Sequence, residues 1–163
     1  MKTDQYFMDK AIEQASKAFN QDEVPIGAVL VDAQGMIIAR GYNQMEKRKS
    51  QLAHAEMSVL HKALKKTKNW RLLDTTLYVT VQPCMMCLGA LYLSRVSRVV
   101  YGAISYKFGM SFDTALSCGI YKNLSMKLEY MEYKKVQEML HLFFRKKRSM
   151  KHVQKDGTRQ NKG

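Results

Sequence analysis

The sequence predicts an α/β protein with three layers, α/β/α, around a five-stranded sheet that is mixed but mostly parallel. Three observations support this prediction. Short β-branched runs alternate with helical patterns, the order that builds parallel sheets covered by helices. A close turn between the first two strands predicts a hairpin and hence one antiparallel pair. The chain has 163 residues and shows no internal repeat or Pro- or Gly-rich linker, which fits a single core.

The predicted elements follow from local patterns. Thr3 can cap a first helix, whose apolar residues recur at helical spacing from Phe7 to Phe19. Gly35 ends a turn that separates the two strands of the hairpin. In chain order we expect a helix capped at residue 3 and reaching 19, strands over 26–31 and 36–42, a loop over 43–51, a helix over 54–66, a strand over 75–81, a helix over 84–93, strands over 97–101 and 126–131, and a helix over 133–148. The segment 105–118 fits no single element, although a short helix is one option.

The charge of the chain indicates a polyanionic partner. Lys and Arg number 27 against 14 Asp and Glu, a net charge of +13. This excess suggests nucleic acid or an anionic membrane surface as the partner, and nucleic acid is favoured over a basic surface that is merely solvated. Residues 134–163 contain ten Lys and Arg and two acids, so they supply +8 of the total. Because the apolar pattern fades after Ser149, we expect a domain over residues 1–148 and a basic tail without fixed structure over 149–163.

The cysteine count and the N-terminus bear on the compartment. Three cysteines are too few, and odd in number, for a disulfide framework. The N-terminal residues lack the apolar core of a signal peptide, and the purely apolar runs are too short to cross a bilayer. The expected location is the cytoplasm, where thiols stay reduced.

Two short motifs predict a metal centre. His54-Ala55-Glu56 begins one predicted helix, and Pro83-Cys84-Met85-Met86-Cys87 begins the next. Cys84 and Cys87 share one face of a first helical turn, where the positive end of the helix favours thiolates. Two thiolates and the His54 imidazole make a good zinc set, and the fourth position is left for water. Glu56, two residues beyond His54, is then placed to take a proton from that water and pass it on.

A structural zinc site or a redox pair of cysteines is the competing interpretation of this C-x-x-C. A structural site requires a fourth protein ligand, for which Cys118 and His61 are the nearest candidates. Cys118 is better explained as a buried thiol, and His61 lies two helical turns beyond His54. The pairing of both motifs, each at a helix start after a strand, favours the catalytic site.

With these motifs the sequence resembles the bacterial tRNA-specific adenosine deaminases of the cytidine deaminase-like zinc superfamily. The likeness covers most of the chain and extends beyond the zinc motifs. It rests on Glu23-Val24-Pro25-Ile26-Gly27-Ala28-Val29, Gly41-Tyr42-Asn43, Ser97-Arg98-Val99-Val100-Tyr101-Gly102-Ala103 and Leu142-Phe143-Phe144-Arg145-Lys146-Lys147-Arg148.

The resemblance implies conversion of adenosine to inosine at the wobble position of a tRNA anticodon, with one Zn²⁺ per subunit. It also implies a homodimer with the active site near the subunit interface. Asn43 and the backbone N–H of Ala55 would face the base, and Val24, Pro25 and Ile26 would form part of the pocket wall. Ser105 and Lys107 would lie in the loop that contacts the nucleotide. The resemblance also implies that six residues close to the tail contact tRNA, namely Phe143, Phe144, Arg145, Lys146, Lys147 and Arg148. For one of the two phenylalanines, packing in the core is the alternative interpretation.

The sequence departs from the family pattern in the segments that the resemblance places beside the substrate. Ser50-Gln51-Leu52-Ala53 replaces the usual Asp-Pro-Thr before the histidine, and Gln44 stands where an Arg is common. Ser105 replaces an Asp, and Phe112-Asp113 replaces a Gly-Ser, while Lys107 and Gly109 are retained. Two other functions therefore stay open: a deaminase of free guanine, cytosine or a nucleotide, and a non-catalytic zinc module that binds RNA.

Overall fold

A computed structural model of the chain describes residues 2–109 and 126–160, with side chains as far as residue 150. Five strands form one sheet in the order β2-β1-β3-β4-β5. The strands are β1 (Gly27–Val31), β2 (Ile37–Tyr42), β3 (Thr76–Val81), β4 (Arg98–Ala103) and β5 (Lys127–Tyr130). The helices are α1 (Asp4–Asn20), α2 (Met45–Arg48), α3 (Ala55–Thr67), α4 (Met85–Leu93) and α6 (Lys134–Gln160), with a short 3₁₀ turn η1 (Gln51–Ala53).

The sheet is mixed and mostly parallel, as predicted, because four of its five strands run in the same direction and β1 alone runs against them. β1 is antiparallel to both β2 and β3, whereas β3–β4 and β4–β5 are parallel. The connection from β2 through α3 to β3 joins two parallel strands that flank β1. Because β1 is antiparallel to β2 in the hairpin, and β2 and β3 run in the same direction, β1 is antiparallel to β3 as well.

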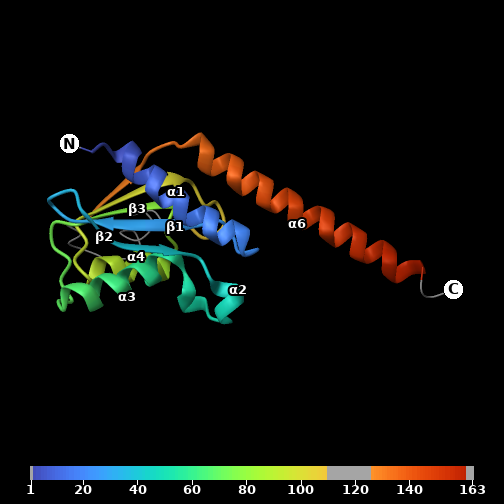
Figure 1. The fold of residues 1–163 in the computed structure, drawn as a ribbon, viewed down its shortest axis with the longest axis horizontal. Coiled ribbons are helices and arrows are strands. Elements are labelled where there is room, and N and C mark those ends of the chain that lie inside the picture. Colours follow the sequence, from blue (N-terminus) through green and yellow to red (C-terminus); the bar gives the residue numbers. More distant parts are fainter. Residues whose placement is uncertain (1, 110–125, 161–163) are drawn as a thin grey trace.

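Helices cover both faces of the sheet, which confirms the three-layer prediction (Figure 1). Successive residues of β1 point to opposite faces. Ala28 and Leu30 join the core under α3 and α4, and Val29 and Val31 join the core under α1 and the start of α6. Within the described residues, none of the helices combines the length and apolar character needed to cross a lipid bilayer.

Two helical predictions need correction. The segment 43–51, expected as a loop, contains α2 and η1. The last helix does not end at Arg148 but continues to Gln160, so the expected tail is helical over most of its length and projects away from the sheet (Figure 1). The run from Arg145 onwards is rich in Lys, Arg, Gln and Met, which are good helix formers and sustain a helix without an apolar face.

Candidate active site

Two helix starts meet at one edge of the sheet and bring the predicted metal ligands together. His54 is the N-cap of α3 and Cys84 is the N-cap of α4, both with extended backbone. Cys87 lies on the first turn of α4 and is buried. The side chains are therefore presented by rigid helix ends rather than by loop tips.

The three ligand atoms fit a zinc ion. His54 Nδ1 lies 3.7 Å from Cys84 Sγ and 3.4 Å from Cys87 Sγ. Zinc bonds of about 2.0–2.1 Å to nitrogen and about 2.3 Å to sulfur, at tetrahedral angles, place such ligands about 3.6 Å apart. All three ligand atoms lie within 4.8 Å of one another, and this is the only such group of His, Cys, Asp and Glu among the described residues.

Among the residues that the structure describes, the group contains three potential ligands and no fourth. His61 is exposed on α3 and is not part of it. Cys118, the other candidate for a fourth ligand, lies outside the described residues.

The thiol groups are poised for metal binding. Hydrogen bonding to Cys87 and then to His54 lowers the pKa of Cys84 to about 4, against the cost of burial. The pKa of Cys87 is raised, first by its hydrogen bond to the Cys84 thiolate and then by its own burial. The pair thus holds one proton in the metal-free chain, and Cys84 carries the negative charge. A cation between them favours loss of the remaining proton as well.

Glu56 is a buried acid beside this group. Its side chain is only 3% exposed, and burial is the first cause of its raised pKa. The charges of His54 and Cys84 act on it in opposite directions. Burial makes a carboxyl group more basic than an exposed one, which suits a residue that accepts and then donates a proton.

Asn43 lies at the end of β2, close to both predicted neighbours. Its backbone N–H donates to the carbonyl of Ile26 at 2.9 Å, which places it beside the run Val24-Pro25-Ile26. The next residue, Gln44, donates its N–H to the carbonyl of Ala53 at 3.0 Å, directly before the predicted metal ligand His54. Ala55 is the first residue of α3, so its N–H has no acceptor within the helix. The structure therefore brings Asn43, the Val24–Ile26 run and the start of α3 together.

The loop after β4 is fastened to the same edge. The N–H of Ser105 donates to the side chain of Gln82, and its hydroxyl accepts from the N–H of Phe108. The backbones of Gly109 and Cys84 form an isolated β-bridge. Lys107 is exposed on this loop, over the ring of Phe108. Residues 112 and 113 lie outside the described residues.

The six predicted RNA contacts all lie on α6, but they differ in exposure. Phe143 is 3% exposed and packs against Phe19 of α1, so it anchors α6 to α1. Lys147 is half-buried and pairs with Asp22 at 2.6 Å. Exposed on the helix are Phe144, Arg145, Lys146 and Arg148.

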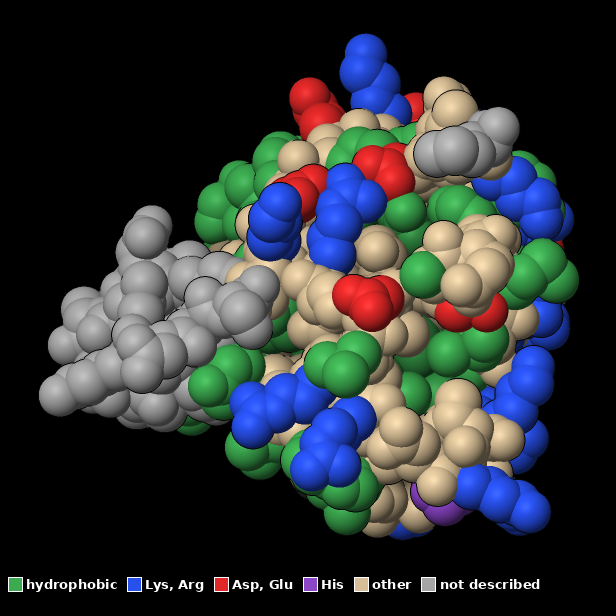
Figure 2. Space-filling model, turned by 90° about the vertical axis from the view of Figure 1, so that its left-hand side faces the viewer, with side chains coloured by type: hydrophobic (Ala, Val, Ile, Leu, Met, Phe, Trp, Pro, Cys, Tyr) green, Lys and Arg blue, Asp and Glu red, His purple; other side chains and the backbone are tan. Residues whose placement is uncertain are grey.

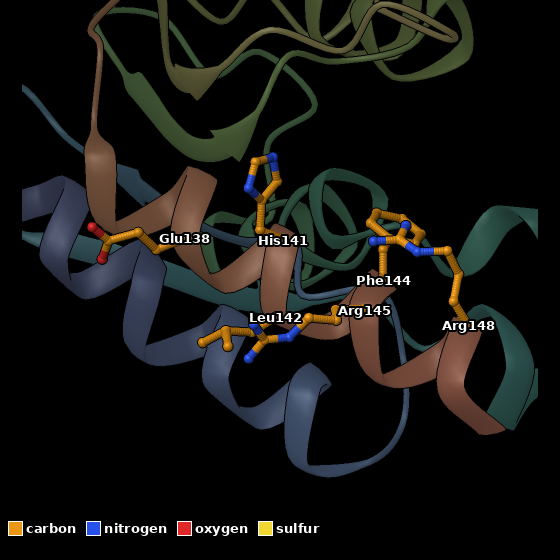
Figure 3. Close-up of a pocket in the computed structure, with 6 residues that line it drawn as sticks. All are labelled: Glu138, His141, Leu142, Phe144, Arg145 and Arg148. Atoms are coloured by element: carbon orange, nitrogen blue, oxygen red, sulfur yellow. The ribbon is translucent and has the colours of Figure 1, made fainter.

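Three of these exposed residues line an open groove of about 620 Å³ (Figure 3). Phe144, Arg145 and Arg148 share it with Glu138, His141 and Leu142, all of them on successive turns of α6. Lys and Arg side chains are also spread over the face of the molecule shown in Figure 2, with fewer acidic side chains among them.

Two residues with structural roles at the site were not predicted. Gln82 links the end of β3 to the loop of Ser105, and the buried carboxylate of Glu23 accepts a hydrogen bond from Asn43. Glu23 stands in the motif that carries the family resemblance, which was the only sign in the sequence of its importance. Its partners come from residues 20 or more positions away and cannot be inferred from spacing.

The fold and the ligand set define a zinc-binding deaminase domain. Residues 1–103 match the family model of the cytidine and deoxycytidylate deaminase zinc-binding region. The chain therefore belongs to this deaminase family.

The relatives within the family are more specific. A tRNA-specific adenosine deaminase of Streptococcus pyogenes serotype M18 is 48% identical over 104 residues, which are 64% of this chain and 65% of that protein. The match thus spans slightly less than two thirds of that relative's length. Another, of Haemophilus influenzae, is 39% identical over 155 residues, 93% of this chain and 89% of that protein. The predicted resemblance to tRNA-specific adenosine deaminases is confirmed.

Solved structures agree with the fold. One from a study of A-to-I editing by tRNA:A34 deaminases at the wobble position of transfer RNA superposes with a TM-score of 0.76 and 35% identity, covering 83% of this chain and 99% of that one. A guanine deaminase from Bacillus subtilis gives a TM-score of 0.59 at 33% identity, covering 73% of this chain and 71% of that one.

Proposed function

We propose that the protein is a zinc-dependent hydrolase that converts adenosine to inosine at the wobble position of a tRNA anticodon. The observation that carries the proposal is the arrangement of three ligand atoms, with no fourth among the described residues, beside the buried acid Glu56. The names of the sequence relatives support adenosine in tRNA as the substrate.

A zinc ion held by His54, Cys84 and Cys87 would supply Lewis acidity, which would make a water molecule nucleophilic near neutral pH. One zinc ion per subunit, held by His54, Cys84 and Cys87, satisfies the ligand set. A structural zinc module would have no use for an uncoordinated, buried Glu56 next to these ligands.

Glu56 moves the protons of the reaction. Water adds to C6 of the adenine and ammonia leaves, so that adenosine and water give inosine and ammonia. The Glu56 carboxylate accepts a proton from the attacking water and donates it to the ring nitrogen, and a second transfer protonates the leaving amine. Its raised pKa matches a group that must change protonation state twice in each turnover.

The base is held by polar groups at the mouth of the site. Asn43 and the free N–H of Ala55 supply hydrogen bonds, with Val24, Pro25 and Ile26 as the wall and with Ser105 and Lys107 toward the nucleotide backbone. An anticodon loop offers bases that are already unstacked, so little energy is needed to bring one into such a pocket.

The basic helix α6 binds the RNA. Arg145, Lys146 and Arg148 attract phosphates, and the exposed Phe144 offers a ring for stacking. Phe143 contributes by holding α6 against α1, and Lys147 by its ion pair with Asp22.

A homodimer is part of the proposal. Large apolar side chains are exposed on the elements that carry the metal ligands, with Met85 56% and Leu93 66% exposed on α4 and Leu52 64% exposed on η1. Such side chains next to an active site favour a protein interface. Sedimentation of the purified protein tests this, since a monomer at micromolar concentration would contradict it.

The decisive assay incubates the zinc-loaded protein with total tRNA, with an anticodon stem-loop, and in parallel with free guanine, cytosine and adenine. We expect inosine in the RNA, detected by mass spectrometry after nuclease digestion. We expect no product when the Glu56→Gln variant replaces the unsubstituted protein. Xanthine or uracil from free bases, with unmodified RNA, would instead identify a small-molecule deaminase.

A further inference from the structure

Glu23 is a buried carboxylate to which the reaction assigns no role. It follows α1, lies directly before the Val24-Pro25-Ile26 run, and is 1% exposed. Burying a charged carboxylate is unfavourable unless hydrogen bonds replace the lost water.

Three donors satisfy the Glu23 carboxylate. Its Oε1 accepts from the N–H of Lys47 at 2.8 Å, and its Oε2 accepts from the N–H of Glu46 at 3.1 Å. The third donor is the side-chain amide of Asn43, whose Nδ2 lies 3.4 Å from Oε2. One side chain thus fixes both the first turn of α2 and the amide of Asn43.

The chemistry of the pair determines how the amide faces. A carboxylate only accepts hydrogen bonds, so the nitrogen side of the Asn43 amide must point to Glu23. The amide oxygen and the second N–H are then left in a defined direction. The backbone of Asn43 is fixed as well, by its hydrogen bond to Ile26, and the side chain is buried at 3% exposure.

We propose that Glu23 is a positioning residue that holds the Asn43 amide in the orientation that binds the purine. This inference rests on the proposed function, in which Asn43 binds the base. Glu23 does not touch the substrate; it acts through Asn43 and through the segment that joins Asn43 to α2. Without it, the amide can rotate and must be ordered again each time a base enters, which weakens binding.

Steady-state kinetics on an anticodon stem-loop test the coupling with Glu23→Gln, Asn43→Ala and the double variant. The isosteric glutamine keeps the volume but turns a donor toward Asn43 or toward α2. We expect an approximately tenfold rise in KM for Glu23→Gln, a smaller change in kcat and unchanged zinc content. The double variant should be no worse than Asn43→Ala alone, because the two residues act as one unit.

Asp32→Asn is the matched control. Asp32 also accepts two backbone hydrogen bonds, from Gln34 at 3.0 Å and Met36 at 2.8 Å, but at the other end of β1. It should leave KM unchanged. An unchanged KM in folded, zinc-loaded Glu23→Gln, or fully additive effects in the double variant, would overturn the proposal.

A measurement on the unsubstituted protein applies even if Glu23 variants do not fold. The assigned NMR signals of the Asn43 side-chain amide should be protected from exchange with solvent. Rapid exchange with solvent would refute the contact. This measurement does not depend on turnover, so it distinguishes failure of the positioning role from failure of the proposed deaminase activity.

Discussion

The backbone of Cys84 forms a β-bridge with that of Gly109, which ties a predicted metal ligand to the loop after β4. A Cβ atom at Gly109 would lie 2.3 Å from Gln82 Oε1 and 2.6 Å from the carbonyl oxygen of Ser105. The second contact is to backbone, so it cannot be relieved by a rotamer change alone. Only glycine allows the loop to close on the metal site in this way.

We therefore expect Gly109→Ala to displace this loop, raising KM for RNA several-fold while zinc content stays the same. Kinetics on the stem-loop together with metal analysis check this. Gly35→Ala is the control: it lies in the hairpin turn at φ +73° with no atom within 4 Å of the added Cβ. It should cost about 1 kcal/mol of stability through its backbone conformation but leave KM unaltered. An effect on KM of equal size in both variants would contradict the argument.

Glu56→Gln should retain zinc and lose activity by at least about 100-fold, because proton transfer by a positioned group contributes about 10²–10⁴-fold. It should not lower the thermal midpoint, since it replaces a carboxyl group whose raised pKa reflects the cost of burying its charge. Single-turnover assays, metal analysis and thermal unfolding measure the three expectations. Substantial turnover by the variant would disprove the shuttle.

Zinc removal should expose the reactivity of Cys84. With a pKa of about 4, its side chain is already a thiolate throughout the neutral range. After chelation, alkylation by iodoacetamide at Cys84 should therefore proceed at nearly the same rate at pH 6 and pH 8, whereas an ordinary thiol would slow markedly at pH 6. Peptide mass spectrometry locates the modification. Restored zinc should block it, and alkylation that zinc does not slow would argue against Cys84 as a ligand.

Arg98 links the N-terminal helix to the far edge of the sheet, and its ion pairs make stability depend on pH. It contacts Asp4 at 2.7 Å and Glu129 at 2.6 Å, and its hydrogen bonds lower the pKa of both carboxyl groups. In the acid range the unfolded chain therefore binds more protons than the folded chain. The stabilisation by these ion pairs is present above the unfolded pKa values, near 4, and is lost as the pH falls below them.

Asp4→Asn should accordingly lower the free energy of unfolding by about 0.5–1 kcal/mol at pH 7, a modest value because the pair is partly exposed. The difference from the unsubstituted protein should be smaller at pH 3, because protonation of Asp4 in the acid range removes part of the stabilisation. Urea unfolding at both pH values gives the comparison, and a gap that widens in acid would mean that the sign is wrong.

Removing residues 145–163 should weaken tRNA binding at least tenfold without affecting zinc content. The segment contains eight Lys and Arg and one acid. For single-stranded RNA the slope of log affinity against log salt changes by about 0.7 for each lost phosphate contact. In the full chain, we expect a smaller slope of log affinity against log salt for the double variant Arg145→Gln, Arg148→Gln. The control is the double variant Lys65→Gln, Lys66→Gln, which makes an equal change of charge at the end of α3 and should leave the slope unchanged. Equal affinity with and without the segment would contradict the role of α6.

The metal site could be predicted from sequence because its parts are local. His54 and Cys84 each precede a helical pattern directly, so the helix start fixes where the side chain lies. The position of Asn43 came only from the family resemblance, since an Asn after a strand is usually a turn residue. The contact that orients it comes from Glu23, 20 residues earlier, and only the fold brings the two together.

The mixed, mostly parallel sheet was predicted correctly, but the place of its one reversed strand, β1, between β2 and β3 was not. Alternating strands and helices indicate crossovers but do not say which earlier strand the crossover passes. Here α3 carries the chain over β1, and that strand becomes antiparallel to both neighbours. The continuation of α6 was missed because a charged segment without an apolar face was interpreted as unstructured.

The length of α6 gives the molecule reach. Its 27 residues, at about 1.5 Å each, form a rod of about 40 Å, and the C-terminal half of this rod stands out from the body of the protein (Figure 1). A polyanion diffusing nearby meets this positive arm before it meets the catalytic mouth. The arm enlarges the target for productive collisions. We therefore expect its charge to raise the association rate of RNA, and we expect this effect to decrease steeply as ionic strength rises.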